Sequence, residues 1–166
     1  QVNPELVIAA SPFSDEAEAF RELRSQLLMG VMAPDQPRRA LAVVSPDVGD
    51  GKTYLATNIA AAFSQLGGPT LFIDADMRTP RSQDVFGITL NRSGLTAMLS
   101  GRAQDGLIQR SSQLPSLFVL PVAEPVMRHA LDIVRASRPK DETCPDDVKK
   151  WVAFGASVRA AQYLVL

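Results

Sequence analysis

Cysteine, histidine and tyrosine are scarce in this 166-residue chain, which holds one cysteine, one histidine and two tyrosines. The single Cys144 excludes an internal disulfide and a metal site made of several cysteines, as suits the reducing cytosol. All apolar runs fall short of the about 18 residues that a membrane-spanning helix needs, and the first residues lack the features of a secretory signal. We therefore expect a cytoplasmic protein, and the missing initial Met suggests a piece of a longer chain.

Neither sign of charge dominates, because 17 basic and 18 acidic residues give a formal net charge of -1. No global field then draws the chain to nucleic acid or to an anionic membrane, so we expect no nucleic-acid partner. With 46% hydrophobic and 21% charged residues, the composition is that of a globular domain with a core.

Short apolar runs alternate with helical patterns over the first three-quarters of the chain. Runs at 40–44, 70–74 and 116–122 predict buried parallel strands, and helices are expected at 15–32, 52–65 and 93–99. The first two strands and the helix at 52–65 would form one right-handed βαβ unit with its strands side by side. We predict an α/β fold of the P-loop NTPase class, with a partial doubly wound parallel sheet of at least three strands, over residues 1–125.

The alternation stops near residue 125. The remaining residues have helical patterns at 126–136, 147–154 and 157–166, separated by proline-containing polar loops. We therefore predict a C-terminal helical appendage over 126–166.

Residues 46–53 match the pattern of a phosphate-binding loop, except that Pro46 stands where the first glycine is usual. Gly49 and Gly51 let backbone N–H groups point inward, and the following helix adds its positive end. Lys52 would reach the β- and γ-phosphates and the Thr53 hydroxyl would bind magnesium. The sequence thus predicts ATP and Mg²⁺ as ligands. The predicted nucleotide-binding residues are Asp47, Val48, Gly49, Asp50, Gly51, Lys52, Thr53 and Tyr54.

Asp74 and Asp76 follow the second strand, at the sheet edge where α/β proteins bind ligands. Either carboxylate could hold magnesium, directly or through water, or orient an attacking hydroxyl. We predict catalytic roles for Lys52, Asp74 and Asp76, and a metal site of Thr53, Asp74 and Asp76. The alternative is that the two aspartates only cap the next turn.

Together these motifs resemble the bacterial tyrosine kinases of exopolysaccharide export, of the chain-length-determinant subgroup, over residues 5–125. Residues 45–53 resemble the Walker A motif of that family and 71–81 its Walker A′ motif, with further likeness at 94–103 and 114–121. The resemblance implies ATP-dependent tyrosine autophosphorylation and a homo-oligomeric ring. It also implies a membrane-bound activator of polysaccharide export, which would bring the protein to the inner face of the plasma membrane.

The same resemblance assigns a subunit contact to Glu18, Arg21 and Arg24, which form the spaced Glu-Arg-Arg motif of the first helix. From the residues alone, these side chains lie on a stripe beside the apolar face of their helix. An intrahelical ion pair on a solvated face is the alternative.

Two parts of that family's pattern are missing from the chain. One is a later strand ending in aspartate, the Walker B motif, and the other is a tyrosine-rich tail, since only Tyr54 and Tyr163 are present. We therefore expect nucleotide binding to survive and phosphoryl transfer to be impaired. The alternatives are a non-catalytic nucleotide-binding or assembly module, or an ATPase of the ParA and MinD type, although that group has a lysine where this chain has Asp47.

Residues 126–166 resemble a different family, the sensor-2 region of MoxR-type AAA+ ATPases, on 130–139, 148–151 and 155–160. Arg159 would be the arginine that senses the γ-phosphate there, with a surface arginine as the alternative. We expect either a chain joined from two pieces near 123–129 or a damaged gene model. His129 lies at that junction and receives no catalytic role.

Overall fold

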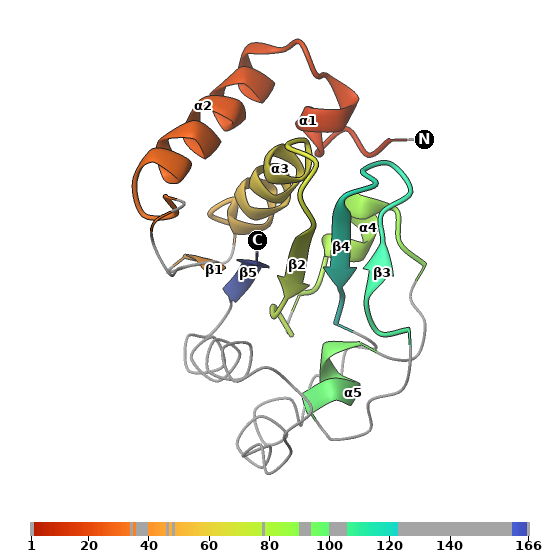
Figure 1. The fold of residues 1–166 in the computed structure, drawn as a ribbon. Helices are drawn as coiled ribbons and strands as arrows, with labels where there is room; N and C mark the ends of the chain where they lie inside the picture. Colours follow the sequence, from red (N-terminus) through yellow and green to blue (C-terminus); the bar gives the residue numbers. More distant parts are fainter. Residues whose placement is uncertain are drawn as a thin grey trace.

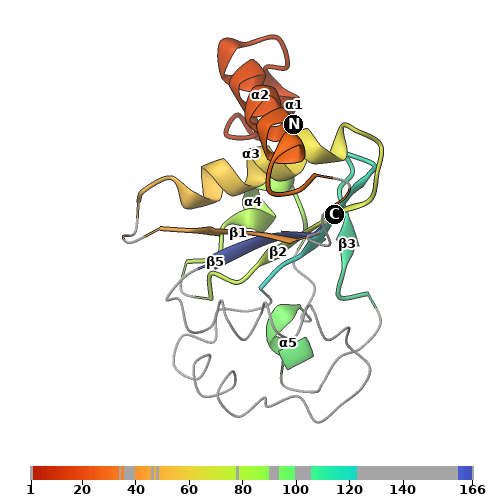
Figure 2. The same ribbon diagram turned by 60° about the vertical axis from the view of Figure 1, so that its left-hand side comes forward.

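The computed structural model describes residues 2–33, 35, 40–45, 47, 49–77, 79–89, 94–99, 106–122 and 161–165. Within this part of the chain, five strands form one sheet in the order β1-β5-β2-β4-β3, with helices on both faces (Figures 1 and 2). The strands are β1 (Ala40–Val44), β2 (Thr70–Asp74), β3 (Gln109–Arg110), β4 (Leu117–Leu120) and β5 (Ala161–Val165). The helices are α1 (Val7–Ala10), α2 (Asp15–Met29), α3 (Lys52–Ser64), α4 (Ser82–Phe86) and α5 (Leu95–Leu99).

The three predicted strands are present and run in one direction. Two of them are buried as predicted, whereas β1 lies at the edge of the sheet and its residues are partly or fully exposed. β2 and β4 pair in parallel, and β1 runs the same way as β2 because both are antiparallel to β5. The helix predicted at 15–32 is α2, which begins as expected, with the Ser14 side chain accepting the N–H of Ala17 at 3.2 Å. The short elements α1, α4 and β3 were not predicted, because so few residues show no periodicity.

Two expectations about the sheet are wrong. Residues 40–44 and 70–74 are not neighbours, because β5 lies between them and pairs with both. Residues 161–165, predicted as part of a helix at 157–166, form that strand instead. The facing edges of β1 and β2 each carry a row of backbone N–H and C=O groups that need hydrogen-bond partners. By forming a strand, residues 161–165 satisfy both rows, and this gain exceeds the helical preference of so short a segment.

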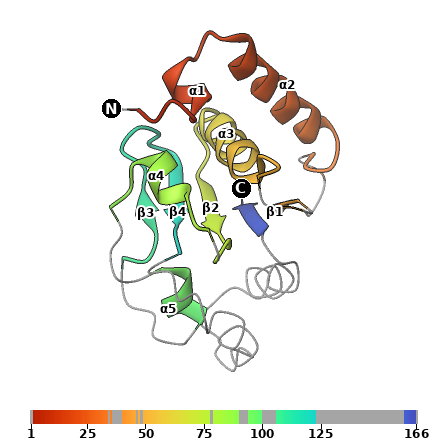
Figure 3. The same ribbon diagram turned by 180° about the vertical axis from the view of Figure 1, so that it is seen from behind.

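Side chains alternate across the sheet and build a separate core on each face. Phe72 of β2 and Leu117 and Val119 of β4 belong to the core under α3 and α4. Their neighbours Ile73 and Leu120 belong to the core under α5. The Phe72 ring meets that of Phe86 edge to face at 5.2 Å, which fixes α4 over β2 and β4 (Figure 3).

The N-terminal segment anchors α3, which is buried from Ala56 to Ser64. The Asn58 side chain accepts the N–H of Ile8 at 3.3 Å and donates to the carbonyl of Glu5 at 2.8 Å. α2 covers the side of α3 that faces away from the sheet (Figure 2). The helix that carries the predicted phosphate loop is therefore held from both sides.

The helices predicted at 126–136 and 147–154 lie outside the described residues, as do Cys144, His129 and Arg159. The predicted junction near 123–129 lies outside them too. Among the helices that the structure does describe, none is long and apolar enough to cross a membrane.

Candidate nucleotide-binding site

The predicted phosphate loop connects β1 to α3 at the carboxyl edge of the sheet. Gly49 and Gly51 have φ angles of +96° and +82°, a region that side-chain-bearing residues rarely adopt. Gly51 is also the N-cap of α3. These conformations require glycine where the pattern has it. Pro46 and Val48 lie outside the described residues.

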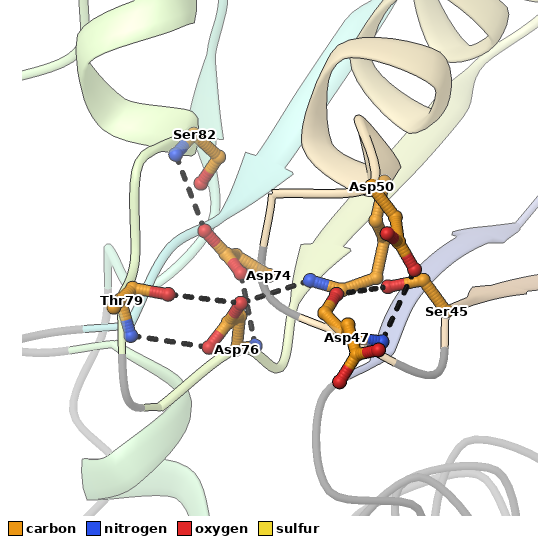
Figure 4. A network of polar contacts seen from close by, with 8 residues as sticks. Ser45, Asp47, Asp50, Asp74, Asp76, Thr79 and Ser82 are labelled. Atoms are coloured by element: carbon orange, nitrogen blue, oxygen red, sulfur yellow. Dashed lines mark hydrogen bonds and ion pairs between the residues drawn. The ribbon is translucent and has the colours of Figure 1, made fainter.

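Polar side chains of the loop make hydrogen bonds to the backbone of the loop itself. The Asp50 carboxylate accepts the backbone N–H of Asp47 at 3.1 Å, and the Ser45 hydroxyl donates to the Asp47 carbonyl at 3.0 Å (Figure 4). A phosphate group binding here would compete with the Asp50 carboxylate for that amide, because both are anions.

Lys52 forms an ion pair with Asp76 across the site. Its Nζ lies 2.9 Å from Asp76 Oδ2, and the two side chains are only 9% and 6% exposed. Two oppositely charged groups from separate sequence motifs thus meet at the end of the loop. A shielded ammonium at this position can attract phosphate oxygens strongly, because little water screens it.

Asp74 lies behind Asp76 and is fully buried. One of its carboxylate oxygens accepts the N–H of Asp76 at 3.0 Å, and the other accepts the N–H of Ser82 at 3.2 Å (Figure 4). Burial raises the pKa of this carboxyl above its ordinary value of 3.8, and hydrogen bonds from Ser82 and from the Asp76 amide offset the rise only in part. The structure thus separates the two aspartates: Asp76 meets Lys52, and Asp74 holds the loop that follows β2.

This raised pKa predicts how stability depends on pH. Between the unfolded and the folded pKa the native state binds more protons, so the free energy of unfolding falls as pH rises through that window above 3.8. Asp74→Asn cannot titrate, so the wild type should lose stability relative to this variant as pH rises. Urea unfolding followed by circular dichroism at several pH values measures the difference.

The control for this experiment is Asp84→Asn, at an exposed carboxylate of α4. This variant removes one carboxylate without touching the buried site, so the slope of Asp74→Asn is compared with the slope of Asp84→Asn. Asp74→Asn also loses one hydrogen-bond acceptor, which changes the free energy of unfolding by the same amount at every pH. Only the slope of the stability difference against pH is therefore informative. A slope of the opposite sign would show that Asp74 is stabilised as the carboxylate.

Thr53 and Tyr54 follow Lys52 in the first turn of α3. Thr53 is half-buried, at the end of the helix where a magnesium ligand is expected. Tyr54 meets Phe20 of α2 edge to face, with ring centroids 5.7 Å apart. Partial burial, together with the negative charge of Glu16, raises the pKa of the Tyr54 hydroxyl.

The Glu-Arg-Arg motif of α2 makes contacts within the chain. Arg21 forms an ion pair with Glu18 at 3.0 Å and also donates to the Pro12 carbonyl. This intrahelical ion pair is what the sequence predicted as the alternative to a subunit contact. Arg24 donates to the Ala62 carbonyl in the last turn of α3 at 2.7 Å. A subunit contact by these three residues stays a prediction, and Arg24 already has a role in joining α2 to α3.

Two residues of this region were not singled out from the sequence. The Thr79 backbone N–H donates to Asp76 Oδ1 at 3.1 Å and its hydroxyl to Oδ2 at 3.3 Å, while Ser82 donates its N–H to Asp74. A possible signal was their position, since threonine and serine shortly after an aspartate pair commonly donate in turns.

The arrangement fits a nucleotide phosphate with magnesium. A loop with two glycines at positive φ, a helix N-terminus and a shielded lysine provide anion-binding groups, and Thr53 and Asp76 provide oxygen ligands that suit Mg²⁺. Fold and loop together define an α/β domain of the P-loop class.

The homologues of this chain are bacterial tyrosine-protein kinases, as the motifs predicted. The chain is 32% identical over 106 residues to tyrosine-protein kinase CpsD of Streptococcus agalactiae, covering 64% of this chain and 46% of that one. It is 30% identical over 117 residues to tyrosine-protein kinase wzc of Salmonella typhimurium, covering 70% and 16%. The chain thus spans less than half the length of these two relatives. No protein-family model matches it.

Solved structures agree on the fold. The kinase domain of Escherichia coli tyrosine kinase ETK superposes with a TM-score of 0.68 at 21% identity, covering 92% of this chain and 55% of that one. The chimerical protein CapA2B2 superposes with a TM-score of 0.65 at 22% identity, covering 96% and 88%. The predicted α/β P-loop fold class is thereby confirmed.

Proposed function

We propose that this chain is the ATP-binding domain of a bacterial protein-tyrosine autokinase of exopolysaccharide synthesis and export, impaired in phosphoryl transfer as it stands. The observation that carries the proposal is the shielded pair of Lys52 and Asp76, which joins a glycine-bearing phosphate loop to the motif after β2. The homology to tyrosine-protein kinases supports tyrosine as the acceptor.

Each group has a defined task in this proposal. Backbone amides of the loop and the N-terminus of α3 bind the phosphates, and Lys52 exchanges Asp76 for the β- and γ-phosphate oxygens. Magnesium, when bound, neutralises charge that develops on the phosphates, and Thr53 and Asp76 would hold it. Asp74 has both oxygens engaged by backbone amides, so we assign it to supporting the loop.

The register of β5 supports impaired transfer. At the carboxyl edge of β1 and β2, this antiparallel strand places Ala161 opposite Val44 and Gln162 opposite Asp74. Neither Ala161 nor Gln162 has a carboxylate side chain. Loss of one metal-organising or positioning group typically costs several kcal/mol at the transition state, whereas ground-state binding relies on the loop, the helix end and Lys52.

We therefore expect saturable ATP binding in the presence of magnesium, with phosphotyrosine near background. A binding titration with a fluorescent ATP analogue and an anti-phosphotyrosine blot after incubation with Mg-ATP measure the two quantities. Robust phosphorylation that is lost in Lys52→Ala would show that a carboxylate after residue 125 supplies the missing function. Absence of any binding would contradict the proposal itself.

The register of β5 also supports a second candidate function, a non-catalytic nucleotide-binding or assembly module. The anti-phosphotyrosine blot distinguishes this module from a kinase. For either candidate we propose a cytoplasmic homo-oligomer, a ring by resemblance, that works with a membrane-bound activator of polysaccharide export. An ATPase of the ParA and MinD type is less well supported, because Asp47 is an exposed acid where that group needs a lysine.

A further inference from the structure

We propose that Thr79 is a positioning residue that holds the Asp76 carboxylate in place when Lys52 turns to the nucleotide. This inference deepens the proposed function and rests on it. Asp76 is almost completely buried, and its oxygens accept hydrogen bonds from Lys52 and from two donors of Thr79. The Thr79 hydroxyl donates to Oδ2 and the Thr79 amide donates to Oδ1 (Figure 4). Lys52 also donates to Oδ2.

Nucleotide binding leaves both Thr79 bonds to Asp76 in place. Lys52 cannot give its full charge to phosphate oxygens and to Asp76 at once, so its bond to Oδ2 weakens when the loop is filled. The two Thr79 bonds fix the plane of the carboxylate, because one residue reaches both of its oxygens. Their contribution is therefore largest in the loaded state.

The segment that carries Thr79 is itself fixed at both ends. Asp74 accepts the N–H of Asp76 at one end and the N–H of Ser82 at the other, from a fully buried position at the end of β2. Thr79 lies between these two anchors, so its hydroxyl stays in reach of Asp76. A buried carboxylate with two backbone partners is costly to move, because any movement leaves charge or amides unpaired.

Matched substitutions at residue 79 isolate the hydroxyl. Thr79→Val keeps the shape and the backbone N–H but removes the donor to Oδ2, and Thr79→Ser restores a hydroxyl. The readout is the Mg²⁺ concentration at half-saturation for binding of a fluorescent ADP, with affinity in EDTA measured alongside. A hydrogen bond to a charged group, here long at 3.3 Å, should be worth roughly 3- to 10-fold in that concentration.

We expect Thr79→Val to raise the half-saturating Mg²⁺ concentration by that factor while affinity in EDTA changes less than about 2-fold, and Thr79→Ser to match the wild type. Coincident magnesium titrations for Thr79→Val and the wild type would overturn the proposal, as would equal losses with and without magnesium, or a Thr79→Ser variant that behaves like Thr79→Val. A wild-type chain that binds no nucleotide would instead reject the proposed function, and this inference with it.

Discussion

Replacing Lys52 with alanine is expected to weaken nucleotide binding by at least about 100-fold. Each hydrogen bond from an ammonium to an anionic oxygen contributes about 1.5–3 kcal/mol, and Lys52 would serve two phosphate groups in a shielded site. A titration with a fluorescent ATP analogue measures the loss. Arg81→Ala is the matched control, because it removes an exposed cation whose ion pair with Glu5 spans 3.1 Å. It should change the affinity by less than about 2-fold.

The same substitution removes the ammonium that pairs with the buried Asp76 carboxylate, which lowers stability by up to about 3–5 kcal/mol. A double variant with both Lys52 and Asp76 replaced by alanine separates the two effects. It should recover part of the stability, measured by thermal unfolding, and still bind nucleotide as weakly as Lys52→Ala does. If the double variant regained binding, Lys52 would serve only to neutralise Asp76.

Replacing Phe72 with alanine should destabilise the fold by about 3–5 kcal/mol. Phe72 is 0% exposed and lies at the centre of the core between β2 and the helices α3 and α4, in edge-to-face contact with Phe86. Removing its ring leaves a cavity that the surrounding side chains fill only in part. Urea unfolding monitored by circular dichroism measures the change in the free energy of unfolding.

Phe13→Ala provides a control of identical chemistry. Phe13 is 100% exposed between α1 and α2, so its removal should change stability by less than about 0.5 kcal/mol. Equal effects of the two substitutions would show that the strand carrying Phe72 is not part of a packed core.

The sequence was most informative where a function needs consecutive residues. Gly49 and Gly51 adopt the positive φ angles that their pattern requires, and Lys52 begins the helix that the pattern places after them. The apolar runs of β2 and β4 also identified their strands, since a strand buried on both faces leaves a continuous apolar signature. The run of β1 identified a strand as well, although β1 lies at the edge of the sheet and has no buried residue. These features depend on short-range chemistry, and an α/β class with a phosphate loop follows from them.

The sequence was least informative about partners that are distant along the chain. The short segment 161–165 has a helical pattern, yet it forms β5 because the edges of β1 and β2 offer it two ladders of hydrogen bonds. Because β5 is antiparallel to its neighbours, its register places no carboxylate at the carboxyl edge of the sheet. The direction of this strand could not be predicted from composition.

The sequence by itself determined the phosphate loop, the strands that flank it and the aspartates after β2. Only the tertiary structure decided which partners each aspartate has, because Asp74 and Asp76 are chemically identical and differ only in what surrounds them. Packing buries Asp74 among backbone amides and brings Asp76 to Lys52, which is 24 residues away along the chain. Short sequence motifs therefore identify the residue types of the site, whereas the partners of each residue depend on tertiary packing.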